Sequence, residues 1–93
     1  MPITFRIPSY LASFANGQSS FALEGSPVTV ANALDALWKL HPALRDRIVD
    51  EQGEVRQHIN IFVGEEAIRF AEGLKTTVPG NVEIMIVPAV SGG

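Results

Sequence analysis

The chain combines two apolar spacings, one typical of strands and the other typical of a helix. Apolar residues occupy every second position in four stretches, 3–7, 21–24, 59–63 and 82–87, which is the period of strands with one buried face. Residues 30–38 instead repeat apolar side chains at intervals of three and four, the spacing of an amphipathic helix. The predicted order is therefore two strands, one long helix and then further strands.

Capping and breaking residues mark the limits of the helical segment. Thr29 is expected to cap its start, because a Thr hydroxyl can accept a hydrogen bond from a first-turn amide. Pro42 ends it, since the residue before a proline resists helical geometry, and Pro42 also suits the start of a short second helix at 43–49. After the third strand we expect a turn at 64–66 and a short return strand at 68–70.

These elements predict an α+β fold. One long helix can cover only one face of the sheet that the strands would form. We therefore expect the β-grasp arrangement, a mixed sheet of four or five strands with one main helix on one face. The domain is predicted to span residues 1–87, followed by a flexible C-terminal tail at 88–93, because Pro88 cannot donate to a sheet ladder.

The face opposite the helix is expected to carry an apolar patch. Phe62, Met85 and Val87 are apolar at positions where the alternation calls for polar side chains. Such a patch beside a free tail is a candidate docking surface for a partner protein, and the alternative is ordinary apolar surface. Arg6 and Arg69 are expected to be solvated surface charges, with contact to a partner enzyme as the alternative.

Composition excludes several classes of function. The 93 residues suffice for one domain, and the absence of cysteine excludes disulfides, thiolate metal sites and cysteine nucleophiles. His41 and His58 lie far apart and outside any metal-binding spacing, so no metal site is expected. A net charge of −3 with mixed signs argues against nucleic-acid binding. No signal peptide and no membrane-spanning stretch is visible, so we expect a cytoplasmic protein without membrane contact.

The last six residues, Pro88-Ala89-Val90-Ser91-Gly92-Gly93, suggest a specific chemistry. Fully extended they would span about 20 Å at roughly 3.3 Å per residue, enough to enter another protein's active site. Gly92 and Gly93 have no Cβ, so a narrow tunnel could close around them. The reacting group would then be the carboxylate of Gly93, with a passive, frayed end as the alternative.

Several segments together resemble the MoaD/ThiS family of sulfur carriers, whose fold is ubiquitin-like. The most specific segments are 29–30, 58–63, 68–74 and 86–93, and the resemblance covers essentially the whole chain. Two turns depart from the family, because Gly64-Glu65 stands where Asn-Gly or Asn-Asp is usual and Asn81-Val82 stands where Gly-Asp is usual. Within the family, segments 7–9, 17–19 and 68–74 look most similar to the carriers of cysteine biosynthesis.

The resemblance implies a protein co-substrate that is not itself an enzyme and binds no cofactor. An E1-like enzyme would bind the head and use ATP and Mg²⁺ to adenylate the carboxylate of Gly93, and a sulfur donor would then displace AMP to leave a thiocarboxylate. Gly92 would provide clearance, while residues 88–91 and the apolar patch would contact the partner. The sulfur acceptor would be a cysteine synthase-like enzyme or, next, the large subunit of molybdopterin synthase, with thiamin synthesis and tRNA thiolation as further recipients.

Two other functions fit the same pattern. A ubiquitin-like modifier would be conjugated to lysines of other proteins through Gly93, using the same fold and tail. A β-grasp interaction module would carry a passive tail. Neither composition nor spacing separates these from a sulfur carrier.

Overall fold

A five-stranded sheet forms the framework of the chain. The computed structural model describes residues 3–23 and 29–88. Its strands are β1 (Ile3–Arg6), β2 (Ser20–Leu23), β3 (Ile59–Val63), β4 (Glu66–Ala67) and β5 (Glu83–Pro88), and its α-helices are α1 (Val30–Leu40) and α2 (Arg45–Ile48). The strands lie in the order β2-β1-β5-β3-β4, with β1 and β5 parallel at the centre and the other neighbours antiparallel.

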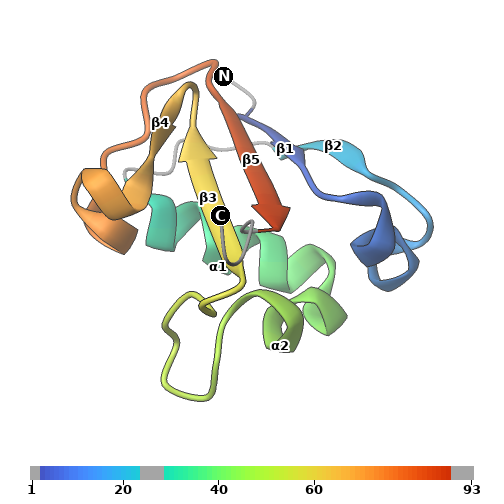
Figure 1. Cartoon of the computed structure of the whole chain (residues 1–93). Coiled ribbons are helices and arrows are strands. Elements are labelled where there is room, and N and C mark those ends of the chain that lie inside the picture. The colour runs from blue at the N-terminus through green and yellow to red at the C-terminus, as the bar shows by residue number, and fades with distance from the viewer. Residues whose placement is uncertain (1–2, 24–28, 89–93) are drawn as a thin grey trace.

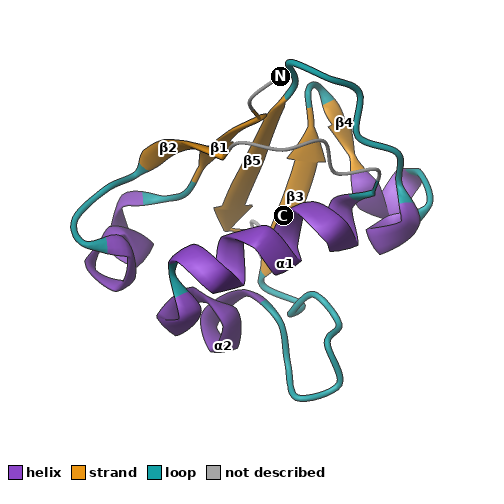
Figure 2. Ribbon diagram, turned by 180° about the vertical axis from the view of Figure 1, so that it is seen from behind, coloured by secondary structure: helices purple, strands orange, loops and turns teal. Residues whose placement is uncertain are grey.

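The helices cover one face of this sheet. Figure 2 shows α1 crossing in front of the strands, and Figure 1, from the opposite side, shows the sheet in front of α1. The predicted α+β architecture, a mixed sheet with one main helix on one face, is confirmed. The other face of the sheet is left without a covering helix in the part of the chain that the structure describes.

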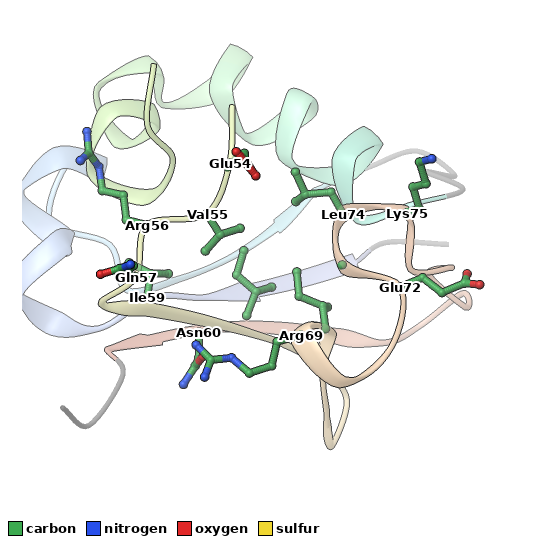
Figure 3. Close-up of a pocket in the computed structure, with 13 residues that line it drawn as sticks. Glu54, Val55, Arg56, Gln57, Ile59, Asn60, Arg69, Glu72, Leu74 and Lys75 are labelled. Carbon is green, nitrogen blue, oxygen red and sulfur yellow. The ribbon is translucent and has the colours of Figure 1, made fainter. Parts of the chain in front are cut away.

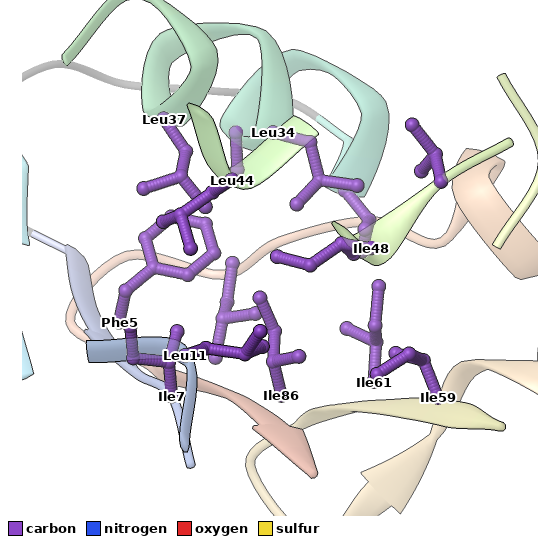
Figure 4. Close-up of a cluster of buried hydrophobic side chains, with 14 of the residues drawn as sticks. Phe5, Ile7, Leu11, Leu34, Leu37, Leu44, Ile48, Ile59, Ile61 and Ile86 are labelled. Carbon is purple, nitrogen blue, oxygen red and sulfur yellow. The ribbon is translucent and has the colours of Figure 1, made fainter. Parts of the chain in front are cut away.

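The core fills the space between α1 and the sheet (Figure 4). Leu34 and Leu37 extend from α1 toward Phe5, Ile61 and Ile86 of the central strands, and all five side chains are buried. Burying a side chain of this kind contributes about 1.5–3 kcal/mol. The strands therefore keep their alternation because one residue in two packs into this layer.

A capping box begins α1. The backbone N–H of Asn32 donates to the hydroxyl of Thr29 at 3.2 Å, and the backbone N–H of Thr29 donates to the side-chain oxygen of Asn32 at 3.3 Å. Two amides that α1 itself cannot pair are satisfied in this way. The predicted cap at Thr29 is confirmed, and Asn32 is its reciprocal partner.

The segment after α1 is tighter than predicted. The expected helix at 43–49 is a 3-10 turn, Pro42–Leu44, followed by the single α-helical turn of α2. Leu44 and Ile48 nevertheless point inward and are fully buried. Proline at the first position of the turn lacks the N–H that would go unpaired there, which explains why this turn tolerates it.

The predicted return strand at 68–70 is wrong. The turn after β3 leads into the two-residue strand β4, after which Ile68–Phe70 forms a 3-10 helix. A 3-10 helix has three residues per turn, so residues two apart do not share a face. Ile68 is accordingly buried, whereas Phe70 is 82% exposed. Two further 3-10 segments, Ser9–Ala15 and Gly73–Lys75, lie in connections.

The capping box generates the first prediction. Replacing Thr29 by Ala removes the acceptor for the Asn32 amide, so we expect the free energy of unfolding to fall by about 1 kcal/mol. Urea unfolding followed by circular dichroism measures this change. Thr29→Ser keeps the hydroxyl and should stay close to the unsubstituted protein. Equal stability of the Ala and Ser variants would contradict a capping role.

Candidate functional site

The face of the sheet away from α1 carries an apolar patch at its centre. Ile84 and Ile86 are buried under α1, and side chains alternate along a strand, so Met85 and Val87 lie on the opposite face. Phe62 of β3 lies directly opposite Met85 in the register of β3 and β5. All three residues of the predicted patch are half-buried and lie on this open face, and their docking role remains a prediction.

Polar side chains border the patch. Arg6 of β1 lies beside Met85 in the parallel register, and Asn60 of β3 lies opposite Val87. The guanidinium of Arg6 is 3.7 Å from the carboxylate of Glu83, and both side chains are substantially exposed. An exposed pair of this kind contributes at most about 1 kcal/mol to stability. The patch thus has an apolar centre and a polar rim, the usual anatomy of a protein–protein contact.

The end of β5 connects this patch to the tail. Pro88 is exposed and is the last residue of β5, opposite Ile59, so the strand continues one residue beyond the predicted boundary at 87. Proline is tolerated there because the ladder ends at this point and no further N–H is needed. Ala89, Val90, Ser91, Gly92 and Gly93 lie outside the described residues, so their predicted roles rest on the sequence.

The patch therefore lies on the same strands that lead to the tail. Val87 directly precedes Pro88, and Met85 lies two residues earlier on the same face. Since β5 is the middle strand of the sheet, its last residue, Pro88, lies on a central strand and not on an edge strand.

A pocket of about 510 Å³ lies beyond the outer edge of β3 (Figure 3). Its apolar floor is built by Val55, Ile59, Ile61, Ile68 and Leu74. Asn60 and Arg69 lie together at one side of it, whereas Glu72 and Lys75 point away. Sequence reasoning missed this pocket because two separate stretches, 54–61 and 68–75, form it together. Segment 68–74, which the sequence analysis singled out, contributes one side of the pocket.

His41 is buried where α1 ends. Its backbone N–H donates to the Leu37 carbonyl at 2.8 Å, and its ring meets Phe21 edge-on with 5.1 Å between the ring centres. Within residues 3–23 and 29–88, no group of three or more His, Asp or Glu side chains is placed to hold a metal ion. No helix in the same residues is long and apolar enough to cross a membrane.

Comparison with known proteins identifies relatives along the full chain. Sulfur carrier protein CysO of Mycobacterium tuberculosis is 30% identical over 95 residues, covering all of both chains. The crystal structure of that CysO has a TM-score of 0.85 at 29% identity, covering 95% of this chain and 99% of its own. CysO in the Amycolatopsis orientalis BexX/CysO complex has a TM-score of 0.84 at 32% identity, covering 98% and 99% of the two chains.

A modifier protein is also among the relatives. Small archaeal modifier protein 1 of Haloferax volcanii is 43% identical over 65 residues, 70% of each chain. Its crystal structure has a TM-score of 0.80 at 32% identity, covering both chains fully. These neighbours share the ubiquitin-like β-grasp fold, which confirms the predicted fold class. The ThiS family model matches residues 6–93, and the chain belongs to the ThiS family.

Proposed function

We propose that this chain is a sulfur carrier whose reacting group is the carboxylate of Gly93. The observation that carries the proposal is the family match through residue 93, on a head whose apolar open face leads directly into the tail. An E1-like enzyme with ATP and Mg²⁺ adenylates the carboxylate, and a sulfur nucleophile then displaces AMP. The product is a C-terminal thiocarboxylate, which an acceptor enzyme consumes.

The chemistry explains why such a carrier needs a partner. A free carboxylate is a poor electrophile, whereas an acyl-adenylate has AMP as a good leaving group. The partner supplies this activation, and the chain supplies a terminus narrow enough to reach it, since Gly92 and Gly93 have no Cβ. Ordering the tail costs about 1–2 kcal/mol per residue. Contacts of Phe62, Met85 and Val87 with the enzyme offset that cost.

Cysteine biosynthesis is the pathway that we favour, with a cysteine synthase-like enzyme as acceptor. Segments 7–9, 17–19 and 68–74 look most similar to the carriers of that pathway, and two of the relatives named above are CysO proteins. One of these CysO proteins has been crystallised in a complex with BexX, which supports a head that docks on another protein. The large subunit of molybdopterin synthase is the next candidate acceptor.

A ubiquitin-like modifier is the second candidate function. Its support is the 43% identity to small archaeal modifier protein 1 over 65 residues. The two functions share the adenylate of Gly93 and differ in the nucleophile that attacks it. A sulfur nucleophile gives a thiocarboxylate, whereas a lysine amine gives an isopeptide bond to another protein.

Intact mass separates the two functions. For protein purified from its own cells, we expect a fraction heavier by the difference between one sulfur and one oxygen atom, located by fragmentation to Gly93. A variant lacking Gly93 should show no such fraction. Immunoblots of the same cells test the modifier, which predicts a ladder of conjugates. If the shortened variant carries the same mass increment, Gly93 is not the site of sulfur transfer.

Charges on the open face should weaken activation. Phe62→Asp or Met85→Asp places a carboxylate in the apolar patch, so we expect the KM of the carrier in ATP-dependent pyrophosphate release to rise by about tenfold or more. Ala22→Asp is the matched control, because Ala22 lies on the same face but on the edge strand β2. Circular dichroism verifies folding of each variant. Equal KM values for the Phe62 variant and the control would refute docking through the patch.

A further inference from the structure

Phe70 is held in an unusually exposed position by a well-anchored turn. Its side chain is 82% exposed, compared with 53% for Tyr10 and 50% for Leu40, the other large exposed apolar residues of the described chain. Two residues earlier, Ile68 is buried in the core, and the Ile68 carbonyl accepts a hydrogen bond from the Ala71 N–H at 3.0 Å. The turn is therefore fixed to the head while most of the Phe70 ring is exposed to solvent.

Arg69 is the middle residue of this turn, and its side chain lines the pocket without an ion pair to any described residue. The two ion pairs found in residues 3–23 and 29–88 involve Arg6 and Arg45, and no side-chain hydrogen bond in those residues involves Arg69. Arg56, also at the pocket, instead donates through Nε to the Asp46 carbonyl at 2.8 Å. Arg69 thus differs from Arg56, because its guanidinium N–H groups make no hydrogen bond to another described residue.

The position of Arg69 joins the pocket to the open face. Asn60, which lies with Arg69 at one side of the pocket, is opposite Val87 in the sheet (Figure 3). Ala67, which directly precedes the turn, is opposite Phe62. Asn60 therefore belongs both to the border of the apolar patch and to the lining of the pocket, and the turn that carries Phe70 begins directly after Ala67.

We propose that Arg69, Phe70 and the adjoining pocket form a second docking surface for the activating enzyme. The matching segment of that enzyme places an apolar side chain in the pocket and a carboxylate against Arg69, while Phe70 enters an apolar recess. Arginine and aromatic residues dominate the energetics of protein contacts, and a guanidinium pairs a carboxylate with two parallel hydrogen bonds. This inference rests on the proposed function.

The chemistry of the pathway selects the activating enzyme over the acceptor. An acceptor enzyme can recognise the thiocarboxylate, a group that ordinary proteins lack. The activating enzyme meets an unmodified carboxylate at the end of a short tail, which is a common group. Its selectivity must therefore come from the head, and a larger head contact provides it.

The test is the steady-state kinetics of pyrophosphate release by the activating enzyme. We expect Phe70→Ala and Arg69→Ala each to raise the KM of the carrier about tenfold with kcat unchanged. Arg69→Lys keeps the charge but loses the planar fork, so its KM should lie between those of the Ala variant and the unsubstituted chain. KM of Arg69→Ala should also depend less on ionic strength. Tyr10→Ala and Leu40→Ala, which remove exposed apolar side chains elsewhere, are the matched controls.

Three outcomes overturn the inference. The first is a KM for Phe70→Ala equal to that of Tyr10→Ala. The second is a defect confined to sulfur transfer, which would assign the surface to the acceptor enzyme. The third is loss of stability in urea that accounts for the kinetic change, whereas an exposed side chain predicts none. If the unsubstituted chain itself releases no pyrophosphate and gains no mass at Gly93, the proposed function fails and this inference falls with it.

Discussion

The parallel pairing of the first strand with the last places β5 in the middle of the sheet. β1 and β5 lie parallel at the centre of the sheet, where Phe5 and Ile84 are register partners and both are fully buried. Contacts between residues so distant along the chain carry a large entropic cost of closure, which the shared core must offset. Because β5 is held in the middle, Pro88 at its end lies beside Ile59 of β3 and not at a free edge.

The open face follows from the same arrangement. The described residues form one long helix, which covers one side of the sheet, and each central strand divides its residues between core and surface. Ile84 and Ile86 hold the strand in place, while Met85 and Val87 of the same strand remain available to a partner. Stability and recognition are thus carried by alternate residues of one segment, so a substitution on the open face can change binding with little effect on the core.

The sequence predicted what depends on local periodicity and missed what depends on distant contacts. The main strands and α1 have clear periods, and Thr29 is a local capping signal. Alternation placed Phe62 and Met85 on one face, but only the register shows them opposite each other. The alternation of Ile68-Arg69-Phe70 predicts a strand, whereas the segment is a 3-10 helix that buries Ile68 and exposes Phe70. The pocket is formed by two separate stretches, 54–61 and 68–75, so no single stretch predicts it.

A carrier and a modifier with this fold differ less in the chain than in the enzymes that bind it. In both, the same carboxylate is activated, and the product is decided by whether sulfur or an amine attacks the adenylate. Gly92 and Gly93 cannot determine that choice, because they have no side chains for an enzyme to recognise. Any information in the chain that decides it must therefore lie on the head. The Phe62–Met85 patch and the turn at Ile68–Phe70 are assigned to activation, which both functions share, so that information lies on other parts of the head.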